Sequence, residues 1–171
     1  MRTIITISLI ALAGLAAAAQ QPPLPATDLT AAEINGFIDK LPKDAISDLP
    51  IKVVDVGGYR VGVYGVFRPK SVKQDAVLHE VRTTEVYQMV EGAGTLVTGG
   101  KLVDERRDPK STTVRGSRIE GGVSRRVTKG DVIIIPGRTP HWWSQLETDI
   151  KYTITRSDPD NRIPLRTGDS R

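Results

Sequence analysis

Short apolar runs that alternate with polar residues and stop at glycine or proline place the strongest limit on how this chain can fold. Between Tyr59 and Phe67 one set of alternate positions reads Val61, Val63, Gly65, Phe67, which is the period of a β-strand with two distinct faces. Gly57-Gly58 precedes this run and Pro69 ends it. The 171 residues include 16 glycines and 11 prolines, so turns are frequent, which favours an all-β sandwich or barrel over a helical bundle.

The same pattern predicts further strands along the chain, at residues 53–56, 76–78, 85–90, 95–98, 132–135 and 150–154. Gly92-Ala93-Gly94 predicts a hairpin between the strands at 85–90 and 95–98. Residues 132–135 are apolar at every position, which predicts a strand buried on both faces or nearly so. Residues 101–129 are charged and polar, and indicate short strands with an exposed loop.

A short helix is predicted ahead of the β-rich region, over residues 28–41. Thr30 and Glu33 have the spacing of a capping box, in which each side chain accepts a backbone N–H of the first turn. Pro42 ends the helix. Its apolar face consists of Ile34, Phe37, Ile38 and Leu41. We expect this face to pack on the outside of the β domain or against a partner subunit.

The N-terminus has the three parts of a secretory signal: a positive start at Met1-Arg2, an apolar run to Ala19, and small residues before Gln20. An uncleaved membrane anchor is the alternative, but the run is short for a full span. The sequence therefore predicts a signal peptide over residues 1–19, a linker and helix over 20–50, a β domain over 51–156 and a tail over 157–171. We expect a periplasmic or secreted protein with no membrane contact after the signal is removed.

The charge balance gives little support for a nucleic-acid partner. The net charge is +4, and the predicted signal contains one basic and no acidic residue. Nucleic-acid-binding proteins carry clustered basic faces, and the short clusters at Arg106-Arg107 and Arg125-Arg126 are better explained as solvated loops. The chain has no cysteine, so neither a disulfide nor a thiolate ligand is available.

Two segments resemble the paired motifs of the cupin superfamily, whose members fold as a small jelly-roll barrel, also called a double-stranded β-helix. The first cupin motif has two histidines one residue apart, then a glutamate, then a glycine after six more residues. His79, Glu85 and Gly92 match it, while Val81 stands at the second histidine. The resemblance covers residues 51–156 and implies the cupin fold for them.

The second cupin motif matches at Gly130, Pro136 and His141. Arg138 stands at the second glycine of that motif, and Gln145 stands at its asparagine. The sequences around Glu85 and His141 are also similar to those of exported bacterial cupin-domain proteins, which agrees with the predicted signal. A dimer formed through a β-strand edge is a further expectation from the resemblance, so a homodimer is one predicted partner state.

The resemblance implies that His79, Glu85 and His141 bind a metal at one end of the barrel, where inward positions of neighbouring strands share a cavity. Two imidazoles and one carboxylate that leave coordination positions open suit one divalent transition metal: Fe, Mn, Zn, Ni or Co. A metal-free pocket in which His141 hydrogen-bonds a ligand is the alternative.

Five more residues are candidates to line the pocket because they share the parity of these three along regular strands; they are Val81, Tyr87, Met89, Trp143 and Gln145. For Tyr87 and Trp143, packing in the core is an equal alternative. One of Trp142 and Trp143 is expected to point outward. Three arginines are candidates to recognise a carboxylate or to lie on a solvated rim; they are Arg68, Arg82 and Arg138.

These residues predict an exported protein that binds a divalent metal and a small organic molecule in its barrel. Three classes of function are compatible with that description. The first is a metal-dependent oxygenase, isomerase or lyase. The second is a non-catalytic protein that binds a small molecule or a metal. The third is a structural dimer with a vestigial pocket.

Overall fold

The structure is a computed structural model that describes residues 23–166, and antiparallel strands account for most of its regular elements. The predicted signal peptide lies outside these described residues, as does the end of the predicted tail. Within residues 23–166, none of the helical structure has the length and apolar character needed to cross a membrane.

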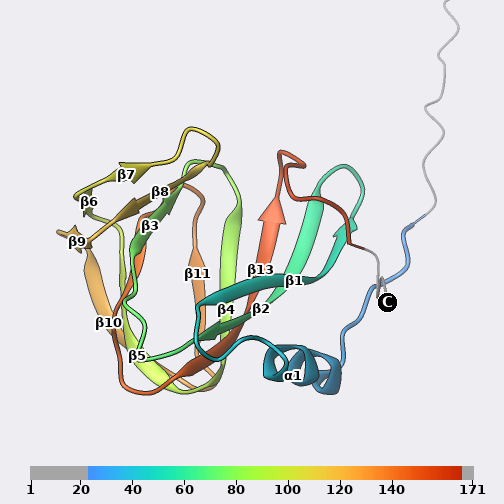
Figure 1. Cartoon of the computed structure of the whole chain (residues 1–171). Coiled ribbons are helices and arrows are strands. Elements are labelled where there is room, and N and C mark those ends of the chain that lie inside the picture. The colour runs from blue at the N-terminus through green and yellow to red at the C-terminus, as the bar shows by residue number, and fades with distance from the viewer. Residues whose placement is uncertain (1–22, 167–171) are drawn as a thin grey trace, which may run out of the picture.

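The strands form two sheets that face each other and a small two-stranded ribbon (Figure 1). In spatial order, the five-stranded sheet contains β1 (Ser47–Asp55), β2 (Arg60–Arg68), β13 (Ile150–Asp158), β4 (Thr84–Glu91) and β11 (Val132–Ile135). The six-stranded sheet contains β10 (Val123–Thr128), β5 (Ala93–Thr98), β12 (His141–Leu146), β3 (Ala76–His79), β8 (Thr113–Gly116) and β7 (Arg106–Arg107). The ribbon pairs β6 (Lys101–Val103) with β9 (Arg118–Glu120).

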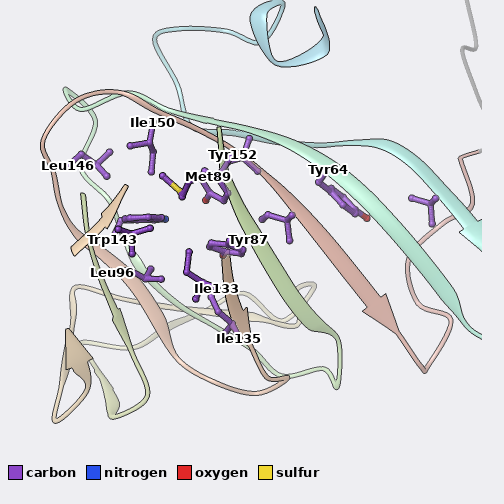
Figure 2. Packing of buried hydrophobic residues seen from close by; sticks show 14 residues of the cluster. Tyr64, Tyr87, Met89, Leu96, Ile133, Ile135, Trp143, Leu146, Ile150 and Tyr152 are labelled. Carbon is purple, nitrogen blue, oxygen red and sulfur yellow. The ribbon is translucent and has the colours of Figure 1, made fainter. Parts of the chain in front are cut away.

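The predicted double-stranded β-helix is confirmed, with one qualification about the barrel. In the part of the chain that is described, strand hydrogen bonds do not continue around a closed barrel, because β1 and β11 are the edges of one sheet and β10 and β7 the edges of the other. The two sheets instead pack face to face. Buried side chains from both fill the space between them (Figure 2), as in other sandwiches.

The predicted helix is confirmed as α1 (Ala31–Asp39). Both halves of the capping box are present, because Thr30 accepts the N–H of Glu33 and the Glu33 carboxylate accepts the N–H of Thr30. The apolar face of α1 packs on the outer side of β2, with Ile38 and Leu41 against Phe67. Gly65 allows this contact, since a Cβ there would lie 2.8 Å from the Phe37 ring.

The hairpin of β1 and β2 is formed as the alternating pattern predicts. The Asp55 carboxylate accepts the N–H groups of Gly57 and Gly58, which closes the turn. The alternation of β2 separates its two faces: Tyr64 and Val66 lie in the core between the sheets, while Phe67 faces α1.

The predicted hairpin at Gly92-Ala93-Gly94 is wrong, because β4 and β5 belong to different sheets. At Gly92 the chain crosses from the five-stranded to the six-stranded sheet. Its φ of 87° lies in the left-handed region, and a Cβ there would lie 2.2 Å from the carbonyl oxygen of Asp149. Only glycine meets both conditions without strain.

The prediction that residues 132–135 are buried on both faces is also wrong. Ile133 and Ile135 point into the core, but Val132 and Ile134 are 60% and 67% exposed. The reason is that β11 is an edge strand whose outer face no other described element covers. One face of this apolar strand therefore belongs to the core and the other face is exposed to solvent.

Candidate metal centre

The three predicted ligands come from two facing sheets. His79 ends β3 and His141 begins β12, and these antiparallel neighbours bring both histidines to the same end of the six-stranded sheet. Glu85 is the second residue of β4 in the five-stranded sheet, with its side chain turned inward, and is only 3% exposed. The site therefore bridges the two layers.

The ligand atoms of these residues converge. Nε2 of His79 lies 3.9 Å from Oε1 of Glu85, and Nε2 of His141 lies 3.4 Å from Oε2. One ligand atom from each of the three residues lies within 4.8 Å of the other two. Metal bonds of about 2 Å place neighbouring ligand atoms about 3 to 4 Å apart, so small side-chain adjustments suffice to hold an ion.

Each imidazole is fixed through its other nitrogen. Nδ1 of His79 lies 2.8 Å from the hydroxyl of Thr113 on β8. Nδ1 of His141 lies 3.0 Å from the carbonyl oxygen of Thr139 and must donate to it, because a carbonyl only accepts. Such contacts orient metal-ligating histidines in known metal sites.

The tautomer of His141 creates a polar mismatch that a cation would remove. With hydrogen on Nδ1, neutral His141 directs the Nε2 lone pair at a carboxylate oxygen of Glu85, only 3.4 Å away. Burial lowers the pKa of His141, and the charges of Arg68 and Arg156 lower it further, which disfavours an imidazolium. Two acceptors that face each other in a buried site suit a metal ion between them.

The other two ligands have ionisation states that also suit a metal. Burial lowers the pKa of His79 to about 4, so its imidazole is neutral at pH 7. Burial alone would raise the pKa of Glu85, but the charge of the Arg156 guanidinium outweighs it and lowers this pKa to about 2. The site thus presents two neutral imidazoles and one carboxylate, the donor set expected for a divalent transition metal.

Arg156 on β13 is the closest charged neighbour of this group. Its Nε donates to Oε1 of Glu85 at 2.7 Å, and its terminal nitrogens donate to the two carboxylate oxygens of Asp48 on β1. The guanidinium also lies over the Tyr64 ring, with 4.2 Å from its carbon to the ring centroid. Arg156 therefore holds the Glu85 carboxylate in place and leaves Oε2 directed toward His141.

A cavity of about 680 Å³ opens beside the three residues, between the two sheets. Its size is in the range of small-molecule sites. Two of the predicted pocket residues, Val81 and Tyr87, line it. Val81 lies in the connection between β3 and β4 rather than on a regular strand. The Tyr87 hydroxyl donates to Oε2 of Glu85 at 3.2 Å.

Met89 and Trp143 lie deeper, in the core, and do not line this cavity (Figure 2). Trp143 belongs to an aromatic row that leads away from the site. Trp143 is 5.9 Å from Tyr152 between ring centroids, Tyr152 is 4.8 Å from Tyr87, and Tyr87 meets His141 edge-on at 6.1 Å. Aromatic side chains attract one another in tilted and edge-to-face arrangements at such separations, so the row is a stable part of the core.

Gln145 points to solvent, contrary to its predicted inward parity. The reason is a bulge in β12: Trp143 pairs with Leu96, but Gln145 pairs with the next residue, Thr95. One extra residue reverses the alternation beyond it, so Leu146 takes the inward position. Trp142 is the outward tryptophan of its pair and donates its indole N–H to the carbonyl of Gln74.

The three arginines considered for carboxylate recognition are in different places. Arg68 lines the cavity, whereas Arg82 forms an ion pair with Asp160 at the surface. Arg138 has a φ of 62°, a left-handed conformation that explains why the cupin motif has glycine there.

Sequence reasoning missed Arg156 and Thr113. Arg156 could have been found, because it continues the inward period of Ile150, Tyr152 and Ile154 two residues beyond the predicted strand end. Thr113 gave no such signal. Its position depends on the pairing of β8 with β3, more than thirty residues earlier in the chain, and local pattern does not report such pairing.

No protein-family model matches the chain, and no curated protein matches it either. Solved structures do resemble it at low identity. An RmlC-like cupin family protein with a double-stranded β-helix fold from Methanocaldococcus jannaschii is 11% identical with a TM-score of 0.42, over 70% of this chain and 87% of that one.

Two further solved structures resemble the chain at similarly low identity. The DMSP lyase DddQ from Ruegeria pomeroyi is 12% identical with a TM-score of 0.49, over 90% of this chain and 84% of that one. KdgF from Halomonas sp. is 19% identical with a TM-score of 0.39, over 61% of this chain and 85% of that one. At these values the likeness concerns the fold and carries no information on activity.

The strand order of the two facing sheets, together with both motifs at one end of them, agrees with the resemblance seen in the sequence. The chain therefore has the double-stranded β-helix fold that the two sequence motifs led us to expect.

Proposed function

We propose that this protein is an exported metalloprotein that binds one divalent transition metal through His79, Glu85 and His141, and binds a small organic molecule in the adjoining cavity. The observation that carries the proposal is the convergence of the three ligand atoms within 4.8 Å. The fixed Nδ1 atoms of both histidines support it, since they leave both Nε2 atoms free to coordinate.

The bound metal would act as a Lewis acid toward a ligand in its open coordination positions. The residues of the chain have separate tasks around it. Arg156 holds the carboxylate of Glu85, and Thr113 and Thr139 orient the imidazoles. Tyr87 stays protonated because burial raises its pKa well above the usual value, so it serves as a hydrogen-bond donor at the site rather than as a base.

Within this proposal, the first candidate function is that of an enzyme: a metal-dependent oxygenase, isomerase or lyase. Three proposed metal ligands, a phenolic proton donor and a cavity of small-molecule size meet at one place. A non-catalytic binding protein is the second candidate. It is favoured by the ion pair between Glu85 and Arg156, which neutralises the carboxylate even without a metal.

The test begins with protein recovered from the periplasmic fraction, without a polyhistidine tag and without added metal. Elemental analysis is expected to find about one transition-metal ion per chain, as the donor set requires. His141→Ala and Glu85→Gln should each lose it. Glu147→Gln is the matched control, because Glu147 is an exposed carboxylate paired with an arginine outside the cluster.

A wild-type protein without bound metal, whose affinity for added Zn²⁺ is unchanged by His141→Ala, would contradict the proposal. Absence of the protein from the periplasmic fraction would contradict export, and retention of residues 1–19 would contradict a cleaved signal. Oxygen uptake with a panel of small acids and phenols then separates an oxygenase from the other classes. Absence of turnover with any tested compound, at full metal occupancy, would favour the binding protein.

A further inference from the structure

We propose that the cavity recognises a small organic carboxylate through Arg68, with Lys73 and Arg115 adding positive charge to its lining. This inference rests on the proposed function and names the chemical class of its ligand. It is carried by the balance of charge around the cavity, by the surroundings of Arg68, and by the apolar part of the lining.

Every carboxylate that lines the cavity already has a guanidinium partner. Asp48 and Glu85 both bind Arg156, at 2.6 and 2.7 Å. Asp75 binds Arg106 at 2.8 Å. Asp48 and Glu85 share the single charge of Arg156, so the lining holds three carboxylates and four cations, which are Arg68, Lys73, Arg115 and Arg156.

The remaining cations of the lining have no such partner. Within residues 23–166, no carboxylate forms an ion pair with Arg68, Lys73 or Arg115, although all three line the cavity. A divalent metal on the three proposed ligands would increase the positive charge further. The cavity thus favours a ligand with negative charge.

Arg68 is the most informative of the three because it is partly buried. Its Nε donates to the Tyr152 hydroxyl at 2.7 Å, and one terminal nitrogen donates to the side-chain oxygen of Gln74 at 2.9 Å. Both partners are neutral, and a guanidinium stays charged in proteins. A charge withdrawn from water without an opposite charge is costly. An anion in the cavity would provide Arg68 with the negative charge that no carboxylate of the described chain provides through an ion pair.

The remaining lining indicates an organic ligand rather than a bare inorganic ion. Apolar side chains, among them Ile46, Val77 and Val81, share the cavity with the charged ones. Two donors of Arg68 are already engaged, which leaves one edge of the guanidinium for a ligand. Such an edge can bind a carboxylate through two parallel N–H···O hydrogen bonds. The apolar side chains of the lining and the free edge of Arg68 together indicate a ligand that has a carboxylate group and an apolar body.

The test compares benzoate with benzamide, which has the same shape and no charge, by calorimetry on the Zn²⁺-loaded protein at one fixed ionic strength. Inorganic phosphate is the third probe. We expect benzoate to bind more tightly than benzamide, and Arg68→Met to reduce this preference about tenfold or more, as loss of a charged hydrogen bond does. Arg125→Met is the matched control, because Arg125 is exposed on β10 and does not line the cavity.

Two further variants keep the proposal testable if Arg68→Met fails to fold. Arg68→Lys keeps the charge and should retain part of the preference. Arg115→Met changes an exposed side chain and should weaken benzoate binding severalfold without affecting benzamide. Equal binding of benzoate and benzamide to the wild type, or an unchanged preference in both arginine-to-methionine variants of the cavity, would overturn the proposal. Tighter binding of phosphate than of benzoate would also overturn it.

The same measurements on His141→Ala separate this inference from the metal proposal. If the preference for benzoate came from the metal alone, it would vanish with the metal and would not depend on Arg68. The inference requires that part of the preference persists in His141→Ala and is lost when Arg68→Met is added. A missing metal with a retained, Arg68-dependent preference would contradict only the proposed function.

Discussion

At the scale of single residues, the candidate site is defined as much by what holds the ligands as by the ligands themselves. Each of the three proposed ligands has a fixed partner outside the cluster: Thr113 for His79, the Thr139 carbonyl for His141, and both Arg156 and Tyr87 for Glu85. Such partners reduce the conformational freedom that a metal would otherwise have to restrict. The site is therefore largely preorganised before any ion arrives.

Thr113→Val tests this preorganisation. The change removes the hydroxyl next to Nδ1 of His79 and nearly preserves side-chain volume, so we expect metal affinity to fall by about 10- to 100-fold. Thr112→Val is the control, because the Thr112 side chain is exposed and only its backbone carbonyl is used, by the N–H of Glu80. Competition with a chromophoric chelator measures the metal affinity of both variants. Equal affinities in the two variants would show that His79 needs no support from β8.

Residue identity could be predicted from the sequence where a spacing rule applies. His79, Glu85 and His141 were named from two motifs with fixed spacing, and the structure places them together. Gln145 could not be placed correctly, because the bulge after Trp143 leaves no recognisable trace in a run of six strand residues. A period-two argument is valid only as far as the next bulge.

At the scale of elements, glycine positions determine where the chain can pass from one sheet to the other. Gly92 is the clearest case, with a left-handed φ and a backbone oxygen where a side chain would begin. The sequence predicted a hairpin at this position, which located the break between the two strands correctly but missed the crossing. A hairpin and a crossing between sheets require the same residues locally, and differ only in which distant strands pair with the two arms.

Gly92→Ala is expected to destabilise the fold by at least about 1–2 kcal/mol, the cost of a left-handed conformation in a residue with a Cβ. The contact with the Asp149 carbonyl adds to this cost. Gly36→Ala is the same chemical change in α1, where a Cβ meets nothing within 4 Å, and should stabilise by about 0.5–1 kcal/mol. Urea unfolding measures both. A Gly92→Ala protein as stable as the wild type would refute the reading of this crossing.

At the scale of the whole molecule, the fold could be predicted because its two signals agree. Alternating strands with frequent glycine turns exclude a helical bundle, and two spaced motifs select one β architecture. The depth of burial could not be predicted in the same way. The strand at 132–135 is apolar throughout, yet half of it faces solvent because no described element packs on the outer face of β11, and such coverage does not follow from local composition.

The exposed side of β11 bears on the predicted homodimer, which stays a prediction. An edge strand with apolar side chains facing outward favours association with another chain, and Val132 and Ile134 are both more than half exposed. We expect light scattering to report a dimer for the wild type and a monomer for Ile134→Lys. Val123→Lys is the control, since Val123 is 70% exposed on an edge of the other sheet. A monomeric wild type would contradict the prediction.

The aromatic row from the core to the site has an optical consequence. The chain has two tryptophans, and Trp143 contacts Tyr152, whose hydroxyl accepts a hydrogen bond from Arg68. Tyr152 in turn stacks on Tyr87, which borders His141. Open-shell ions such as Co²⁺ or Ni²⁺ quench nearby indole emission, whereas Zn²⁺ does not. If the three proposed ligands bind such an ion, Trp143 is expected to report it by a loss of fluorescence, without any attached label.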